Sequence, residues 1–339
     1  MKTPHRTATL RDVAQVAGVS PSTASRVLNG GDKGVSEALA VRVLAVADSL
    51  GYVSNQAAQA LRGRRTAVVL LASDPRTASI AAIAAGMEEA GRKQGVMVSI
   101  TAAGSDARAH HAALSVLRDL RPRALVVTSA SFASSARGAM LPELDEFQAD
   151  GCSVVFIGEH ETRFPAVRFD DASIGRVMAA HVAALGRERI AIAYTPGHPA
   201  MESRRQGFLE GLAEHGIDPN SVHSEQCEVS RDGGRAAAAR LTALDPVPEV
   251  VMAGNDVVAF GVLAELRHRG IDVPGEIAVT GVDDIPLAQD VSPALTTVAL
   301  PFVAAGRAAL EVALATDEPA DVHLTGRLVV RESTAGLAS

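Results

Sequence analysis

The chain has 339 residues, of which 47% are apolar and 21% charged, and its formal net charge is −7. This length predicts two or three domains, since ~100–200 residues per domain is usual, and the composition is typical of a folded globular protein. No apolar run reaches the ~18–20 residues of a membrane span, no apolar segment follows the basic N-terminus as in a secretory signal, and two cysteines are too few for a disulfide framework. We therefore expect a soluble cytoplasmic protein rather than a secreted, membrane-embedded or zinc-stapled one.

The charge is distributed unevenly along the chain. Residues 1–66 carry nine Lys and Arg against four Asp and Glu, which makes this stretch +5, whereas the remainder is −12. A small basic head on a large acidic body is typical of a polyanion-binding module joined to one that binds no polyanion. The alternative is chance scatter of the charges.

Two short helices open the basic head. Thr9 and Asp12 have the spacing of a capping box, in which the Thr side chain accepts from a first-turn amide and the acid returns the bond. Gly18 ends the first helix, because the left-handed residue that closes a helix favours glycine. Ser20 and Pro21 begin the second helix, as an N-cap followed by a proline at the first helical position.

A third helix completes a helix-turn-helix pattern. It begins after Ser36 and carries an apolar stripe of Leu39, Val43, Leu44, Ala47 and Leu50. Two short helices joined by a glycine-containing turn, with a third packed across them, form a unit whose second helix enters the major groove of DNA. There Arg26 can donate two hydrogen bonds to a guanine, and Ser22 or Thr23 can reach a base or a phosphate. The alternative is a three-helix domain of another function.

The whole head resembles one known family. TLRDVAQVAGVSPSTASRVLNG, followed by VSEALAVRVLAVADSLGYVSNQAAQALRGRRT, is similar to the DNA-binding head and hinge of the LacI/GalR repressors over a long, nearly ungapped stretch. Leu39 and Ala40 depart from a Thr-Arg pair common in that family, and the loop GGDKGVS is one residue longer. The resemblance implies that the DNA-binding residues are Ser20, Pro21, Ser22, Thr23, Arg26 and Asn29, with Tyr52 and Asn55 supporting the hinge and backbone contacts and Leu61 in the hinge.

The segment NQAAQAL, residues 55–61, is expected to be helical only when it is docked. Seven residues are too few for a stable isolated helix, which needs ~12–15. The resemblance implies that Leu61 inserts between base pairs in the minor groove beside its counterpart from a second subunit, and such wedges kink the duplex by ~20–90°. The alternative is an ordinary linker with one incidental leucine.

From Ala67 onward, short apolar runs alternate with amphipathic stretches. Candidate strands are Val68–Leu71, Val96–Ile100, Leu125–Val127, Val154–Ile157, Ile190–Ala193, Val250–Met252 and Ala278–Val279, and candidate helices cover 80–94, 107–120, 172–185, 203–215, 232–243 and 256–269. Continuous apolar strands with intervening helices predict parallel sheets covered on both faces. Such sheets bind ligands beyond the carboxyl ends of their strands.

Residues of about 66–335 resemble the effector-binding core of the same family, which is itself similar to periplasmic sugar-binding proteins. The resemblance implies an α/β fold of two doubly wound lobes behind the all-α head, with the chain crossing between lobes near 160–166, 293–298 and 322–327. The predicted organisation is a DNA-binding head over 1–53, a hinge and linker over 54–66, and an effector-binding and dimerisation core over 67–339. Lobe 1 then covers about 67–162 and 297–323, and lobe 2 about 163–296 and 324–339.

The resemblance also implies an effector site between the lobes. Carried over position by position, it assigns the contacts to Asp74, Ser79, Asp170, Arg204, Asn255 and Asp283. Carboxylates and an arginine facing a cleft can grip ligand hydroxyls through charge-assisted hydrogen bonds. The alternative for Asp170 and Asn255 is that each caps the helix that follows it.

Aromatic side chains for stacking on a sugar are scarce. The sequence has no Trp and only ten Phe and Tyr, its first-strand loop SDPRTASIAA lacks the Asn-Pro-Phe-Phe often found in the family, and Val282 replaces a frequent aromatic residue. Phe164, Phe208 and Phe260 are the nearest candidates. A sugar and a sugar phosphate both remain possible as the effector.

These patterns predict a ligand-responsive transcriptional regulator, a repressor in preference to an activator, that binds a palindromic operator as a homodimer in the cytoplasm at the nucleoid. Neither a GxxxxGK[ST] nor a GxGxxG pattern is present, and we expect no cofactor, no metal and no enzymatic activity. Two rival classes are a transport solute-binding protein, which predicts a secretion signal and no helix-turn-helix, and an enzyme that uses Asp170 and Asp283 as an acid/base pair.

Overall fold

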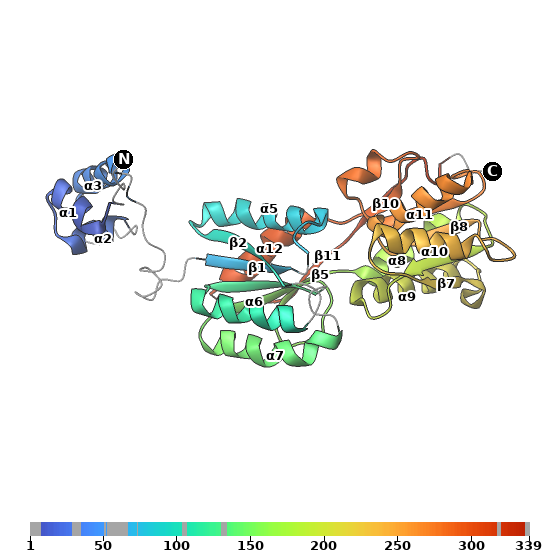
Figure 1. Ribbon diagram of the computed structural model, residues 1–339, viewed down its shortest axis with the longest axis horizontal. Coiled ribbons are helices and arrows are strands. Elements are labelled where there is room, and N and C mark those ends of the chain that lie inside the picture. The colour runs from blue at the N-terminus through green and yellow to red at the C-terminus, as the bar shows by residue number, and fades with distance from the viewer. Residues whose placement is uncertain are drawn as a thin grey trace, which may run out of the picture. The chain divides into compact units, whose positions relative to one another are not determined.

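The computed structural model describes residues 8–28, 35–50, 52, 67–72, 74–103, 107–129, 134–316 and 320–335. The chain divides into two compact units, Met1–Thr66 and Ala67–Ser339. The second unit consists of two α/β lobes (Figure 1).

The first unit is a three-helix head made of α1 (Leu10–Ala17), α2 (Pro21–Leu28) and α3 (Glu37–Ser49). The predicted capping box is present, because Asp12 N donates to Thr9 Oγ1 at 3.3 Å and Thr9 N donates to Asp12 Oδ2 at 2.8 Å. Gly18 closes α1 in the left-handed conformation, with φ 66°. These local bonds fix where α1 begins and ends.

Small apolar side chains pack the three helices of the head together. Its core consists of Val13, Ala14, Ala17, Ala24, Val27, Val43 and Ala47. The predicted stripe of α3 is broader than the buried one, since Leu44 is 52% exposed and Leu50 is 36% exposed. A helix of this length buries only the side chains that face α1 and α2, and these two leucines lie off that face.

Lobe 1 is built on a six-stranded parallel sheet. Its strands are β1 (Ala67–Ala72), β2 (Met97–Ala102), β3 (Ala124–Thr128), β4 (Ser153–Ile157), β5 (Ala166–Phe169) and β11 (Val322–Leu324), in the order β11-β5-β4-β3-β1-β2. The helices of this lobe are α5 (Ala78–Lys93), α6 (Ala107–Leu120), α7 (Ser134–Ala149) and α12 (Phe302–Leu314). α5 packs against α12 and α6 against α7, so that the two pairs cover opposite faces of the sheet (Figure 1).

Lobe 2 repeats this plan with a later part of the chain. Its strands are β6 (Ile190–Tyr194), β7 (His223–Gln226), β8 (Val250–Ala253), β9 (Ala278–Asp283), β10 (Thr296–Ala299) and β12 (Arg327–Val329), in the order β12-β10-β9-β8-β6-β7, and β12 alone among them is antiparallel. The covering helices are α8 (Asp171–Ala183), α9 (Pro199–Glu214), α10 (Arg231–Leu241) and α11 (Asp256–Arg269). Helix α8 packs on α9, and α10 packs on α11.

The chain crosses between the lobes three times. The crossings follow β5, follow β10, and connect β11 to β12. Since β5 belongs to the sheet of lobe 1 and β10 to the sheet of lobe 2, the boundaries predicted at 162/163 and 296/297 each lie one strand too early. Both strands are short, and β10 begins with two buried threonines rather than an apolar run. The third crossing lies within the predicted range of 322–327.

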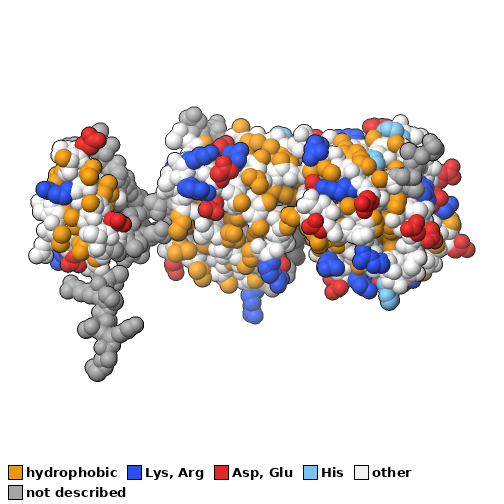
Figure 2. Space-filling view, turned by 90° about the horizontal axis from the view of Figure 1, so that it is seen from above, with side chains coloured by type: hydrophobic (Ala, Val, Ile, Leu, Met, Phe, Trp, Pro, Cys, Tyr) orange, Lys and Arg blue, Asp and Glu red, His pale blue; other side chains and the backbone are white. Residues whose placement is uncertain are grey.

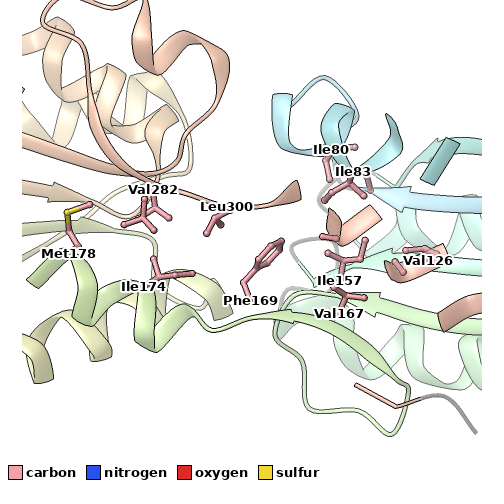
Figure 3. Close-up of a cluster of buried hydrophobic side chains, with 14 of the residues drawn as sticks. Ile80, Ile83, Val126, Ile157, Val167, Phe169, Ile174, Met178, Val282 and Leu300 are labelled. Carbon is pink, nitrogen blue, oxygen red and sulfur yellow. The ribbon is translucent and has the colours of Figure 1, made fainter. Parts of the chain in front are cut away.

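Apolar packing is continuous through the crossing region. Figure 3 shows Ile174, Met178, Val282 and Leu300 of lobe 2 and the crossing segment on one side and Ile80, Ile83, Val126, Ile157 and Val167 of lobe 1 on the other, with Phe169 between the two groups. All of these side chains belong to one buried cluster. The two lobes are therefore joined by packed side chains as well as by three chain segments.

Candidate functional site

The helix α2 presents a short polar face to solvent. Pro21, Ser22 and Arg26 are exposed, whereas Ala24 and Val27 on the opposite side are buried. Ser20 accepts a hydrogen bond from Thr23 N at 3.1 Å, and its hydroxyl lies 2.7 Å from that of Ser22. Capping and hydroxyl contacts thus hold the N-terminal end of α2, the part that meets base edges in a helix-turn-helix protein.

The other predicted DNA-binding residues lie elsewhere in the head. Tyr52 is half-buried against the core of the head, and its backbone N–H donates to Ala47 O at 2.9 Å. This bond pairs a carbonyl group in the last turn of α3. Asn29, Asn55 and Leu61 lie outside the described residues.

A cavity of about 240 Å³ lies between the two lobes of the core, at the carboxyl ends of their strands. Lobe 1 and the crossing segments line it with Thr77, Ala78, Ser79, Ile80, Ile83, Thr128, Ser129, Ile157, Gly158, Phe169 and Phe302, and lobe 2 with Asp171, His198, Ala200, Met201, Arg204, Val229, Asn255, Val257, Asp283 and Ile285. The lobe 1 side is apolar with four hydroxyl groups, whereas the charged side chains come from lobe 2. This is where open α/β sheets bind ligands.

Arg204 connects three parts of lobe 2 beneath this cavity. Its Nε donates to Asp171 Oδ1 at 2.7 Å, and its Nη1 donates to Gly254 O at 2.9 Å and lies 3.6 Å from Asp283 Oδ1. Burial alone would lower the pKa of the Arg204 guanidinium, but the carboxylates of Asp171 and Asp283 raise it above its ordinary value. Arg204 is therefore charged and already engaged by protein groups.

The buried carboxylates outnumber this one guanidinium. Burial raises the pKa of Asp283 to about 6 even though Arg204 opposes the shift, and burial together with Asp283 raises the pKa of Asp256 to about 8. Asp256 accepts from Thr297 Oγ1 at 2.6 Å and from Ile285 N at 2.9 Å. Asp256 thus orders the loop that carries Asp283.

That loop has an unusual backbone. Asp283 and Asp284 have φ values of 123° and 55°, a region that residues other than glycine rarely adopt. Asp284 is held by Arg331, whose Nη2 lies 2.7 Å from Asp284 Oδ1. Strained backbone of this kind persists only where its surroundings fix it, and here Asp256 and Arg331 do so.

The structure separates the predicted effector residues into two groups. Ser79, Arg204, Asn255 and Asp283 line the cavity. Asn255 also caps α11, accepting from Val258 N at 3.0 Å, so both of its proposed roles are compatible. These four come from four different segments of the chain, brought together only by the folding of the two lobes.

Asp170 and Asp74, which are also predicted to contact the effector, do not line the cavity. Asp170 is exposed and caps α8 by accepting from Ser173 N at 2.9 Å, and the next residue, Asp171, lines the cavity in its place. Asp74 forms an exposed ion pair with Arg76 at 2.8 Å and is not among the lining residues. The rival enzymatic hypothesis relied on Asp170 and Asp283, and this pair does not meet in the cavity.

The aromatic lining was also missed from the sequence. Phe164, Phe208 and Phe260 are each less than 5% exposed, within the cores of the lobes. The phenylalanines at the cavity are instead Phe169 and Phe302, which meet edge to face with ring centroids 5.5 Å apart. The sequence feature that points to Phe169 and Phe302 is their position beside the first and second crossings between the lobes.

His198 is a further residue of the cavity. It caps α9, accepting from Met201 N at 3.5 Å, and burial together with Arg204 lowers the pKa of its imidazole to about 4. His198 is therefore neutral near pH 7. Within the described ranges, no helix is long and apolar enough to cross a bilayer, and no three His, Cys, Asp or Glu side chains are grouped to hold a metal ion.

Comparison with known proteins identifies both units. Residues 9–55 match the family of bacterial regulatory proteins of the lacI family, and residues 179–334 match a periplasmic binding protein-like domain. The chain is 32% identical over 339 residues to the HTH-type transcriptional regulator GntR of Pseudomonas aeruginosa. This alignment covers 96% of this chain and 95% of GntR.

Two solved structures share this architecture. The transcriptional regulator CelR in complex with cellobiose matches with a TM-score of 0.70 and 28% identity, over 96% of this chain and 99% of that one. The lac repressor dimer bound to operator and the anti-inducer ONPF has the same fold, with a TM-score of 0.79 and 23% identity, over 97% of this chain and 99% of that one. With a helix-turn-helix head, a two-lobed core and full-length similarity to GntR, the chain belongs to the lacI family and is a DNA-binding transcriptional regulator.

Proposed function

We propose that this regulator is a repressor that binds a palindromic operator as a homodimer and changes its DNA affinity when a small molecule occupies the cavity between the lobes. The observation that carries this proposal is the cavity itself, which gathers Arg204, Asn255 and Asp283 between two lobes on the same chain as a helix-turn-helix head. The complexes of CelR with cellobiose and of the lac repressor dimer with its operator support it by similarity. The protein acts in the cytoplasm, on chromosomal DNA, without catalysing a reaction.

The head supplies the DNA contacts in this proposal. Ser20, Pro21, Ser22, Thr23, Arg26 and Asn29 read the operator from α2 and its end, Tyr52 and Asn55 support the backbone contacts, and Leu61 enters the minor groove. Figure 2 shows Arg and Lys side chains interspersed with Asp and Glu over the visible face of lobe 2. Such a mixed surface does not attract a polyanion as the basic head does.

Effector and operator are coupled through the core. A ligand that contacts both lobes favours one angle between them, and a change in that angle alters the spacing of the two heads in the dimer. A coupling free energy of this kind is typically ~1–3 kcal/mol, and it is reciprocal. Either sign of this coupling free energy is compatible with repression. An inducer lowers the affinity of a repressor for its operator, and a corepressor raises it.

The test is selection of bound duplexes from a random pool, with and without a panel of small metabolites. We expect an inverted-repeat consensus whose retention changes with one class of metabolite. Arg26→Ala, which alters the exposed face of α2, serves as the matched variant and should lose the consensus at one position in each half-site. Recovery of no preferred sequence by the unaltered protein at moderate ionic strength would contradict the proposal.

A further inference from the structure

A short loop of lobe 2 joins one wall of the cavity to the second crossing between the lobes. Asp283 and Ile285 line the cavity and lie at the two ends of the segment 283–285, which we call the cavity loop. Strand β10 runs beside β9, with Ala299 opposite Asp283, and the chain then crosses to lobe 1. There Phe302 begins α12 and lines the cavity from the other side. The crossing therefore connects two walls of the same cavity.

Two contacts attach the cavity loop to this crossing. Leu300 N donates to Asp283 O at 3.3 Å, at the point where the chain leaves lobe 2. The second contact runs through Asp256, the first residue of α11, which is completely buried. Asp256 Oδ2 accepts from Ile285 N at 2.9 Å, and its Oδ1 accepts from Thr297 Oγ1 at 2.6 Å. One carboxyl group thus bridges the cavity loop and β10.

This bridge is tightly packed. Thr297 is completely buried, and it pairs with Gly281 of β9, where an added Cβ would contact Asp256 Oδ1. The cavity loop holds Asp283 and Asp284 at positive φ, a conformation that persists only where the surroundings fix it. A close-packed interior transmits strain rather than absorbing it. A displacement of the cavity loop is therefore passed on to β10.

The bridge lies outside the cavity itself. Neither Asp256 nor Thr297 is among the described residues that line the cavity, so their bond acts without a direct contact to a bound molecule. We propose that Asp256 and Thr297 are positioning residues, whose bond makes the second crossing follow the cavity loop and so sets the angle between the lobes on which operator affinity depends. This inference rests on the proposed function, because it names the link between the cavity and that angle.

The test is operator binding by full-length Thr297→Val without any added metabolite. Valine has the shape of threonine but lacks the hydroxyl that donates to Asp256. The probe is the inverted-repeat duplex recovered by selection from the random pool, since a bias in the lobe angle shifts operator affinity even in the absence of an effector. We expect the dissociation constant to change at least ~5-fold, the lower limit of usual allosteric coupling, in either direction. A smaller change in the folded variant would overturn the proposal.

Two control variants separate this role from a merely structural one. Thr297→Ser keeps the hydroxyl and should restore the dissociation constant of the unaltered protein. Thr280→Val makes the same substitution on the neighbouring strand β9, at a completely buried position whose hydroxyl has no hydrogen-bond partner among the described residues. This control should leave operator affinity unchanged. No recovery in Thr297→Ser, or an equal change in Thr280→Val, would contradict a positioning role.

Urea unfolding shows which of these variants are folded. If Thr297→Val is unfolded, Asp256→Asn takes its place, because an amide group has one acceptor oxygen where two donors converge on the carboxyl group. The same limit of ~5-fold in the dissociation constant applies to Asp256→Asn, and a smaller change overturns the proposal.

Amide hydrogen exchange without DNA tests the link independently of the operator. The amide of Leu300 should exchange faster in Thr297→Val than in the unaltered protein or in Thr280→Val, because the crossing has lost an attachment. Equal exchange at Leu300 would overturn the inference and leave the proposed function intact. Failure of the unaltered protein to select any inverted repeat would instead contradict the proposed function, and the exchange result would still decide whether the link exists.

Discussion

Arg26 is the residue of α2 with the strongest capacity to discriminate between bases. It is exposed near the end of the helix, opposite the buried Ala24 and Val27. Arg26→Ala should weaken operator binding by ~1–3 kcal/mol and relax the preference at one base position, because a bidentate contact to guanine is lost. Binding of single-base operator variants measures this effect.

The matched control for Arg26 is Arg42→Ala, which removes one positive charge from the exposed side of α3. A charge that acts only through the phosphate backbone contributes alike to every sequence. Arg42→Ala should therefore weaken all duplexes uniformly, if at all. The same uniform loss in Arg26→Ala would show that Arg26 does not read a base.

Arg204 is predicted to serve stability as well as effector binding. Its removal leaves Asp171 and Asp283 buried without their cation, and breaking a buried ion pair costs ~3–5 kcal/mol. Arg204→Met should lower the free energy of unfolding of the core by about that amount in urea and abolish the effector response of operator binding. At temperatures where the core remains folded, operator binding without effector should be retained.

Arg204→Lys separates the two roles of this residue. Lysine keeps the positive charge but cannot reproduce the fixed fork of a guanidinium, which here reaches Asp171 and Gly254 O together. We expect Arg204→Lys to recover most of the stability but little of the effector response. A normal effector response in either variant would remove Arg204 from the site.

Adjacent residues show what the sequence can predict at this scale. The sequence predicts Asp170 at the start of a helix beside the cleft, and the structure confirms that placement, but Asp171 is the residue of this helix start that lines the cavity. One residue caps α8 and the other begins it, so their side chains leave the helix in different directions. Only the packing of α8 against α9, which buries Arg204, decides which carboxylate enters the cavity. Asp171 could not be chosen from composition or spacing.

At the scale of elements, the crossing of α8 and α9 places Arg204 against Asp171. The two helices approach so closely that a Cβ at Gly207 would lie 2.0 Å from Ala172 O, and one at Gly175 would lie 2.2 Å from Arg204 O. Only glycine permits this contact without displacement of the backbone. The geometry of the ion pair therefore depends on two residues that carry no side chain.

Gly207→Ala should separate these helices. Overpacking of this kind typically costs ~1–3 kcal/mol, and because Arg204 lies on α9 one turn before Gly207, the shift should also weaken effector binding. Urea unfolding and ligand titration measure the two effects. Gln206→Ala, at an exposed neighbouring position of α9, is the control and should change neither. Unchanged effector affinity in a destabilised Gly207→Ala would show that the site tolerates the displacement.

The burial of a strand largely decides whether the sequence predicts it. The central strands β1, β3, β4, β6 and β8 are fully buried or nearly so, and their apolar runs identified them. The missed strands include β7, which reads HSEQ, and β11, which reads VHL; neither is fully buried at any position. Such strands are specified by pairing with distant segments, which periodicity along the chain does not record. The lobe boundaries at β5 and β10 are misplaced for another reason, because each of these strands has only four residues, with Arg168 in the first and two threonines in the second.

At the scale of the whole molecule, the resemblance to one family predicts a head followed by a two-lobed core, and the structure shows which residues of the two lobes line the cavity between them. The cavity is lined by residues of β3, β4, β5 and β9 and of the starts of α5, α8, α9, α11 and α12. No local pattern links Phe302 to Phe169, which are separated by most of lobe 2 in the sequence. The set of residues that line the cavity therefore follows only from the folded arrangement of the two lobes.

The buried carboxylates of lobe 2 predict how the stability of the molecule depends on pH. The pKa of Asp283 is raised to about 6, and that of Asp256 to about 8, from an ordinary value of 3.8. The folded state thus holds these protons more tightly than the unfolded state, so their contribution is fully present below about pH 3.8 and is lost as the pH rises through 6 and 8. Arg204 and Asp171 face Asp283. The Arg204 cation lowers the pKa of Asp283, and the Asp171 carboxylate raises it.

We therefore expect the advantage of Asp283→Asn over the unaltered protein, measured as the free energy of unfolding in urea, to increase from pH 5 to pH 8. The amide is neutral throughout this range and so escapes the cost of ionising a buried carboxyl. Asp170→Asn serves as the control, because it removes an exposed carboxyl group close to the same region. If the difference for Asp283→Asn were constant with pH, Asp283 would be ionised throughout that range, and the ion pair with Arg204 would outweigh the burial of its carboxyl group.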